Sequence, residues 1–214
     1  MKILAIDFSS PQRSVAVLSA SGAAELLETD PKATDPLGII EAVLRGAQLR
    51  REQIEGIAIG LGPGSYTGIR ASIALAQGWQ LARGVKLLGV SSAEVIAAQA
   101  RTDGRSGMVH VVIDAQRGEF YLTTFELTAD SVRELAPLKI VSLAELHQRE
   151  QAGEVLLGPE VTRWFPGGSI VFPRAATLAQ LASTRTDFVA GEKLEPIYLR
   201  ETTFVKAPPA RNIQ

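Results

Sequence analysis

Short hydrophobic runs bounded by turn residues dominate the first part of the chain. Residues 2–7 form such a run, and residues 13–19 and a segment from Gly22 follow it after short polar turns. Successive runs of this kind are typical of an antiparallel β-meander. Residues 56–60 and 86–90 are continuous apolar runs of the kind found in buried parallel strands. The first half therefore predicts a sheet that mixes antiparallel and parallel strands.

Three further segments have helical periodicity. From Pro36 onward apolar residues recur at intervals of three and four, which predicts an amphipathic helix over residues 37–49. A glycine-rich loop over residues 61–67 leads into a second helix, from about Gly68 to Arg83, and Ser91 can cap a third over residues 92–101. Strands that alternate with helices are typical of α/β folds.

The order of strand, aspartate, turn and second strand occurs twice. A strand over residues 109–113 ends at Asp114 as the first strand ends at Asp7, and a turn then leads into a strand over residues 119–125. The remainder of the second half predicts a helix at 143–151, a short strand at 155–157 and a helix near 178–184. Since residues 102–107 are rich in turn formers, we expect two related lobes, residues 1–102 and a smaller lobe of residues 103–214.

Composition removes several classes of function. The chain has no cysteine, and His110 and His147 lack the spacing of a metal site, so we expect no bound metal. Its 22 basic and 23 acidic side chains give a formal charge of −1, which argues against a surface built to neutralise many phosphates. No apolar stretch has the length of a signal-peptide core or a membrane span, so we expect a cytoplasmic protein without membrane contact.

The densest local motif is the glycine-rich segment at residues 60–70. It lacks the Gly-Lys-Ser/Thr ending of a P-loop and the glycine spacing of a dinucleotide-binding turn, and Ser65 lacks the flanking glycines of a nucleophile elbow. Backbone amides at the start of a helix can hold an anion. A tight turn that needs positive φ and close packing is the favoured interpretation.

Asp7 and Asp114 each follow a strand, at the edge where α/β sheets place ligand groups. Two carboxylates can hold hydrated Mg²⁺ or orient a water molecule. An actin-like Mg-ATPase or a small-molecule kinase that uses both residues and the glycine-rich loop is therefore the alternative function. Each aspartate can equally be a turn residue that binds its own backbone, and this interpretation is favoured.

One side of the second helix is lined by small residues. Ala71, Ser72, Ala74, Ala76 and Gly78 stand among larger apolar side chains. A small-residue face lets another element approach closely, and that element can be the sheet of the same chain or the helix of a partner. Both interpretations remain open at this point.

Five blocks of the sequence resemble the TsaB (YeaZ) family over nearly the whole chain. They are residues 3–7 with 14–17, 62–70, 89–92, 113–121 and 195–200, in the family's order. The block Gly-Pro-Gly-Ser-Tyr-Thr-Gly-Ile-Arg is specific, because general phosphate loops do not share it. The resemblance implies the actin-like, Hsp70-like (ASKHA) fold in a shortened form, with two ribonuclease-H-like lobes of mixed sheets flanked by helices and a reduced second lobe.

The resemblance also implies a function. Family members are non-catalytic partners of TsaD, which transfers a threonylcarbamoyl group to the adenosine beside the anticodon of tRNA, and they act together with the ATPase TsaE. It implies a homodimer when the chain is alone, contact with tRNA only through the complex, and no cofactor. The partner surface would lie on the helices at 37–49 and 68–83, at Leu37, Ile40, Val43, Leu44, Ile69, Ser72, Ile73, Ala76 and Trp79. A degenerate ligand cleft would be formed by Asp7, Gly62, Gly64, Ser65, Thr67, Arg70 and Asp114.

Two features qualify the resemblance. Related names suggest a glycoprotease, but the chain has no cysteine, no serine with a placed histidine and no zinc motif, so we expect no catalytic residues and no peptidase activity. Members of the family often have a His-Ser or His-Thr pair before the first helix, where this chain has Ala33-Thr34. Any role of that histidine does not carry over to this chain.

Overall fold

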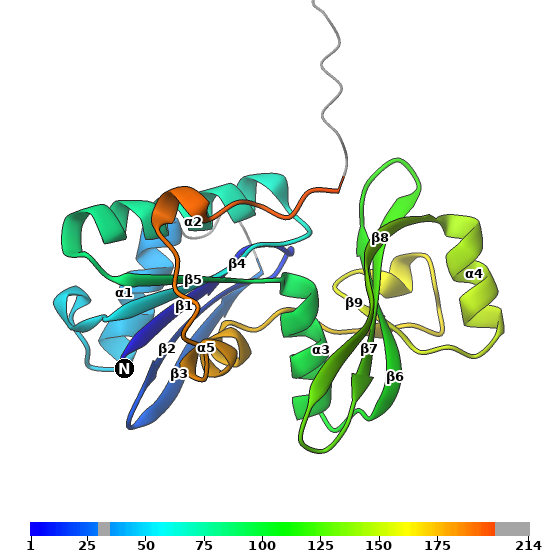
Figure 1. Cartoon of the computed structure of the whole chain (residues 1–214), viewed down its shortest axis with the longest axis horizontal. Helices are drawn as coiled ribbons and strands as arrows, with labels where there is room; N and C mark the ends of the chain where they lie inside the picture. Colours follow the sequence, from blue (N-terminus) through cyan, green and yellow to red (C-terminus); the bar gives the residue numbers. More distant parts are fainter. Residues whose placement is uncertain (30–34, 200–214) are drawn as a thin grey trace, which may run out of the picture.

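The computed structural model describes residues 1–29 and 35–199, which form two lobes, each built on a five-stranded sheet (Figure 1). The Ala33-Thr34 pair and Arg200 of the last sequence block lie outside the described residues. In the first lobe the strand order is β3 (Gly22–Glu28), β2 (Arg13–Ser19), β1 (Ile3–Asp7), β4 (Gly56–Gly60) and β5 (Lys86–Val90). Strands β1 to β3 are antiparallel neighbours, whereas β4 and β5 run parallel to β1.

The second sheet repeats this topology. Its order is β8 (Val132–Ser142), β7 (Glu119–Leu127), β6 (Gly107–Asp114), β9 (Leu156–Gly158) and β10 (Ser169–Ile170). Again the first three strands in the chain are antiparallel and the last two are parallel to the first of them. This equivalence confirms the predicted α/β architecture of two ribonuclease-H-like lobes. Strand β8 was not predicted from the sequence; it is an edge strand in which Pro137 is tolerated.

Helices cover both faces of the first sheet. They are α1 (Pro36–Gly46), α2 (Tyr66–Arg83), α3 (Ser92–Thr102) and α5 (Ala175–Ser183). Helix α4 (Leu143–Gln151) belongs to the second lobe. The structure also has three short 3-10 helices: η1 (Arg51–Gln53), η2 (Val161–Arg163) and η3 (Gly191–Lys193). Leu4 and Ile6 of β1 face α1 and α2, whereas Ile3 and Ala5 face α5. Burial on both faces explains why β1 is a continuous apolar run.

Helix α3 lies between the two sheets (Figure 1). Val95 packs with the core beneath the first sheet, and the next residue, Ile96, packs against the second sheet. The two lobes therefore share this helix as a common wall.

The division of the chain at residues 102/103 does not follow the packing. Helix α5, in the second half of the sequence, lies on β1 and β2 of the first lobe (Figure 1). Farther along, Val189 pairs with Leu87 at the edge of the first sheet, and Leu194 enters the core beneath α2. The chain thus leaves the first lobe after α3, forms the second lobe, and returns. The prediction of two sequential lobes is corrected accordingly, because sequence order does not reveal this long-range packing.

Candidate functional site

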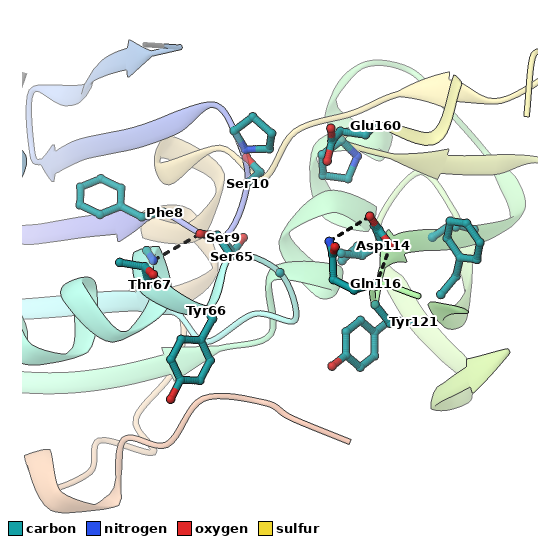
Figure 2. Close-up of a pocket in the computed structure, with 18 of the residues that line it drawn as sticks. Phe8, Ser9, Ser10, Ser65, Tyr66, Thr67, Asp114, Gln116, Tyr121 and Glu160 are labelled. Atoms are coloured by element: carbon teal, nitrogen blue, oxygen red, sulfur yellow. Dashed lines mark hydrogen bonds between the residues drawn. The ribbon is translucent and has the colours of Figure 1, made fainter. Parts of the chain in front are cut away.

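A cleft of about 620 Å³ lies where the two lobes face each other (Figure 2). From the first lobe it is lined by the turn after β1 and by the glycine-rich loop with the start of α2. From the second lobe it is lined by the turn between β6 and β7 and by the segment that precedes η2. The carboxyl ends of β1 and β6 both point to this cleft, which is where ligands of α/β sheets bind.

The glycine-rich loop is held against the turn after β1. A Cβ atom added at Gly64 would lie 2.0 Å from the carbonyl oxygen of Ser9, and one added at Gly68 would lie 2.0 Å from that of Phe8. Ser65 donates its backbone N–H to Ser9 O at 2.7 Å, and its Oγ accepts the N–H of Gly68 at 3.3 Å. Gly62 and Gly64 have φ of +85° and +147°, which favour glycine. The favoured packing interpretation of this motif is therefore confirmed.

Asp7 is sealed beneath this loop and does not line the cleft. Its Oδ1 accepts hydrogen bonds from the N–H of Ser9 at 2.9 Å and from its hydroxyl at 2.6 Å, and its Oδ2 accepts one from Ser92 Oγ at 2.8 Å. Burial raises the pKa of Asp7, although these hydrogen bonds act in the opposite direction. A Cβ added at Gly60 would lie 1.9 Å from Asp7 Oδ2, so the carboxylate occupies space that only glycine leaves free at this position.

Ser92 connects Asp7 to the glycine-rich loop, and sequence reasoning did not predict this role. Besides binding Asp7, its Oγ accepts the N–H of Gly62 at 3.1 Å, and its own N–H donates to Gly62 O at 2.8 Å. Asp7 and Gly62, predicted to lie in the ligand cleft, are thus buried structural residues that join β1, the loop and α3. The serine pair at the start of α3 was visible in the sequence, but its contact with a residue 85 positions away was not.

Asp114 does reach the cleft, as predicted (Figure 2). Its Oδ1 accepts the backbone N–H of Gln116 at 2.7 Å, and its Oδ2 accepts the side-chain amide of the same residue at 3.0 Å. Gln116, Arg117 and Gly118 all have positive φ, which makes the turn tight. Asp114 is therefore the turn residue that the favoured interpretation predicted. It lines the cleft together with Glu160, whereas Asp7 does not line the cleft.

The mouth of the cleft is aromatic. Ser65 and Thr67 line it, and Tyr66 between them stacks on Tyr198, with ring centroids 5.3 Å apart. Arg70 lies over the Tyr66 ring at 4.6 Å and donates a hydrogen bond to its hydroxyl. Sequence reasoning placed Ser65, Thr67 and Arg70 at the cleft; Ser65 and Thr67 line it, whereas Arg70 does not. Both tyrosines were overlooked, since Tyr198 is brought here only by the returning C-terminal segment.

Two amides of the glycine-rich loop and the start of α2 already donate hydrogen bonds within the protein, those of Ser65 and Gly68. Within residues 1–29 and 35–199, no group of three or more His, Cys, Asp or Glu side chains is arranged to hold a metal ion. In the same described part of the chain, no helix is long and apolar enough to cross a membrane.

The predicted partner residues on α1 and α2 mostly point inward. Seven of them are at most 6% exposed in the monomer: Ile40, Val43, Leu44, Ile69, Ser72, Ile73 and Ala76. All of these except Ser72 belong to the core that also includes strands of the chain's own sheet. The prediction that their side chains contact a partner is wrong, because the apolar stripe that it used is the core-facing one. Leu37 and Trp79 remain accessible and line a shallow apolar groove between the two helices.

That groove has a volume of about 490 Å³. Its floor is made by apolar and small residues, and its rim carries Arg51, Glu52 and Arg83. The small residues of α2 therefore divide between two surfaces: Ala76 faces the sheet, whereas Ala74 and Gly78 face outward. Packing against the chain's own sheet is thus observed for part of this helix, and contact of its outward side with a partner stays a prediction.

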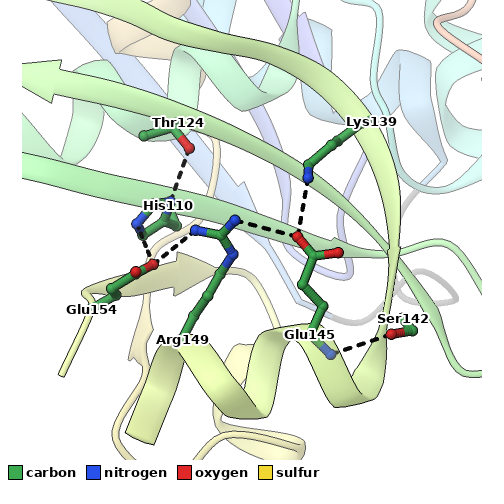
Figure 3. Close-up of polar contacts among 7 residues, drawn as sticks. All are labelled: His110, Thr124, Lys139, Ser142, Glu145, Arg149 and Glu154. Atoms are coloured by element: carbon green, nitrogen blue, oxygen red, sulfur yellow. Dashed lines mark hydrogen bonds and ion pairs between the residues drawn. The ribbon is translucent and has the colours of Figure 1, made fainter. Parts of the chain in front are cut away.

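A second polar cluster lies in the core of the second lobe (Figure 3). His110 of β6 is 2% exposed; its Nδ1 lies 2.9 Å from Thr124 Oγ1 and its Nε2 lies 2.8 Å from Glu154 Oε2. Arg149 of α4 donates to Glu154 at 2.9 Å and to Glu145 at 3.3 Å. The network ties α4 to the sheet, so His110 is the structural strand residue that the sequence suggested.

Protonation of His110 is expected to destabilise the protein in mild acid. Burial lowers its pKa, and Arg149 acts in the same direction while Glu154 opposes it. The pKa of His110 in the folded protein lies below its value of about 6.5 in the unfolded chain. The unfolded chain therefore takes up the proton first, and the protein loses stability as the pH falls from about 6.5 toward the pKa of the folded state. In urea unfolding between about pH 7 and pH 5, His110→Gln should lose less stability than the wild type. His147→Gln, which retains His110, should lose as much stability as the wild type. Equal losses in all three proteins would contradict the assignment of this pH dependence to His110.

Comparisons with known proteins agree with one another. A family model described as TsaD, tRNA N6-adenosine threonylcarbamoyltransferase, matches residues 35–199. The tRNA threonylcarbamoyladenosine biosynthesis protein TsaB of Escherichia coli is 28% identical over 99% of this chain and 100% of its own length. TsaB of Haemophilus influenzae is 26% identical over 97% of this chain and 98% of its own length.

Two solved structures from Pseudomonas aeruginosa have the same fold. One, described as an uncharacterized protein with similarity to peptidase YEAZ, superposes with a TM-score of 0.81 at 26% identity, over 93% of this chain and 99% of that one. The other, YeaZ, superposes with a TM-score of 0.79 at 25% identity, over 92% and 99%. The likeness extends over both lobes, so it includes the cleft between them.

Proposed function

The chain belongs to the TsaB (YeaZ) family, within the larger family described as TsaD, and we propose that it acts in tRNA threonylcarbamoyladenosine biosynthesis as a non-catalytic partner of TsaD. In this role it binds TsaD through the groove between α1 and α2, forms a homodimer through the same surface when alone, and acts together with TsaE. The relatives' names support the pathway, and the exposed apolar surface supports the mode of action.

The observation that carries this proposal is the exposure of large apolar side chains on the outer side of α1 and α2. Leu81 of α2 is 91% exposed and Leu37 of α1 is 47% exposed. Leu81 lies one helical turn after Gly78, which lines the groove with Trp79. Covering a fully exposed leucine contributes about 1.5–3 kcal/mol to association. An apolar surface bordered by charges is typical of a protein–protein contact.

The burial of Asp7 supports a non-catalytic role. In the alternative, an actin-like Mg-ATPase or small-molecule kinase, Asp7 and Asp114 would have to face a common metal–nucleotide complex. Asp7 is instead 0% exposed and its oxygens bind Ser9 and Ser92. The residue that the alternative needs most is thus committed to holding the loop and α3 together.

The test is copurification of tagged chain with untagged TsaD. Leu81→Glu places a charge on the proposed contact without touching the core, and we expect it to weaken recovery of TsaD by about tenfold. Met108→Glu is the matched control, because Met108 is 52% exposed on β6 of the other lobe. Its recovery of TsaD should equal that of the wild type.

Reconstitution tests the role itself. With TsaD, TsaE, tRNA and a source of threonylcarbamoyl-adenylate, the wild-type chain should restore modification, and Leu81→Glu should restore it poorly. Alone, the chain should not hydrolyse Mg-ATP. Failure of the wild type to bind TsaD, or Mg-ATP hydrolysis that Asp114→Asn abolishes, would overturn the proposal in favour of the enzyme alternative.

A further inference from the structure

Three arginines around the cleft between the lobes lie over aromatic rings. Arg13 lies over Phe8 at 5.4 Å, Arg70 over Tyr66 at 4.6 Å and Arg163 over Trp164 at 5.0 Å, and all three rings line the cleft. Within residues 1–29 and 35–199, none of these arginines forms an ion pair with a carboxylate. Arg70 donates one N–H to the Tyr66 hydroxyl, and a guanidinium group placed over a ring can still offer its remaining N–H groups to a further partner.

The tyrosine pair extends this arrangement across the cleft mouth. Tyr66 is 55% exposed and Tyr198 is 37% exposed, although their rings stack on each other. Tyr198 is fixed from behind, because the neighbouring Ile197 donates its N–H to Leu61 O at 2.9 Å and Leu194 is buried in the core. An exposed ring on an anchored segment offers a rigid surface on which another planar group can stack.

The charge of this region differs from that of the whole chain. Arg13, Arg70 and Arg163 oppose two carboxylates that line the cleft, Asp114 and Glu160, so the rim is net positive while the chain carries −1. Arg70 and Arg163 lie outside the lining of the cleft, over rings that line it, whereas Arg13 lines the cleft together with the two carboxylates. A ligand that combines negative charge outside with planar, hydrogen-bonding groups inside matches this distribution.

Unstacked RNA has that distribution, since its phosphates lie outside and its bases offer flat faces with amino groups. Proteins recognise single-stranded RNA by stacking bases on aromatic rings and arginine planes, and by hydrogen bonds to base edges. We infer that the rim formed by Arg13, Tyr66, Arg70, Arg163 and Tyr198 binds an unpaired segment of RNA, with one base stacked on the exposed face of Tyr198. This inference rests on the proposed function, in which the RNA is a loop of the tRNA held by the complex with TsaD.

The experiment measures RNA binding by the full-length chain, alone and in complex with TsaD, by fluorescence anisotropy. The probe is a single-stranded RNA of about ten nucleotides, and the comparison is a duplex of the same sequence. The single strand should bind the complex more tightly than the duplex does. Tyr198→Ala should weaken single-strand binding about tenfold, and Tyr198→Phe, which keeps the ring, should bind nearly as the wild type does.

Arginine variants separate stacking from charge. Arg163→Ala should weaken binding and make it less dependent on salt, whereas Arg163→Lys should keep the salt dependence and lose part of the affinity. Thermal melting checks that each variant is folded, and recovery of TsaD is measured on the same preparations. If the wild-type chain does not recover TsaD, the proposed function is rejected. RNA binding by the isolated chain then decides the RNA inference.

Three results would overturn the inference. They are equal binding of single strand and duplex, unchanged affinity of a folded Tyr198→Ala variant, and complete competition by Mg-ATP, which would assign the cleft to a nucleotide.

Discussion

Replacement of Gly64 by alanine is expected to lower the free energy of unfolding by about 3–5 kcal/mol. The new Cβ would lie 2.0 Å from the carbonyl oxygen of Ser9, and φ at this position is +147°, which side chains other than glycine rarely adopt. The colliding atom belongs to the backbone, so it cannot move aside by changing a rotamer. Relief requires the loop to separate from the turn after β1, which breaks the hydrogen bond from Ser65 N to Ser9 O.

Urea unfolding followed by tryptophan fluorescence measures this effect. The effect at Gly64 has two causes, the steric collision and the positive φ. Gly68→Ala tests the collision alone, because Gly68 is in α2 and its added Cβ would meet Phe8 O at the same 2.0 Å. Gly78→Ala is the matched control, since nothing lies within 4 Å of its added Cβ and the exposed helix should gain up to about 1 kcal/mol. If Gly64→Ala unfolds at the same midpoint urea concentration as the wild type, the packing role of the loop is contradicted.

This loop illustrates what the sequence predicted correctly and why. Glycines at 62 and 64 between a buried strand and a helix indicated positive φ and close packing, because both are local properties of the backbone. Local periodicity likewise predicted β2, β5 and α4 with their observed bounds. The recurrence of a strand and an aspartate at Asp7 and Asp114 predicted two equivalent lobes for the same reason.

The errors concern contacts between residues distant in sequence. The periodicity of α1 and α2 showed that each has an apolar face, but a sequence does not show whether a partner or the chain's own sheet covers it. Ile40 and Ile73 therefore seemed available to a partner, although β-strands of the same chain bury them. Leu81, which is 91% exposed, was not selected, because it lies off the apolar stripe. A solitary leucine on the polar side of a helix is the local signal that could have identified it.

The return of α5 to the first lobe was the other feature that local patterns did not predict. The residue before this helix, Arg174, does not cap it with its own side chain. Instead Ser14 Oγ accepts the N–H of Ala175 at 2.8 Å, and Glu25 Oε1 accepts the N–H of Ala176 at 3.0 Å. Glu25 also accepts hydrogen bonds from the Arg174 guanidinium, at 2.9 Å from its Nε, and from Ser14 Oγ at 2.7 Å. Strands β2 and β3 thus supply the cap of a helix about 150 residues later in the chain.

This cap predicts that Glu25→Ala lowers the free energy of unfolding by about 3 kcal/mol at neutral pH. The Glu25 side chain is only 10% exposed, so its removal leaves a guanidinium and a helix N-terminus without their acceptor. Glu126→Ala is the matched control: Glu126 binds Arg133 at 2.7 Å on the surface, where an ion pair contributes at most about 1 kcal/mol. A similar loss from both variants would contradict the capping role.

The pH dependence gives an independent test of the same contact. Burial alone would raise the pKa of Glu25, but hydrogen bonds from Arg174, from the N–H of Ala176 and from Ser14 outweigh it, and the pKa is lowered. Since the folded pKa lies below the unfolded one, this stabilisation is complete above the ordinary glutamate pKa of about 4.3 and is lost as pH falls through the folded pKa. The difference in unfolding free energy between wild type and Glu25→Gln should therefore shrink as the pH falls below about 4. A difference that stays constant over that range would mean that the ionised carboxylate does not hold α5 on the first lobe.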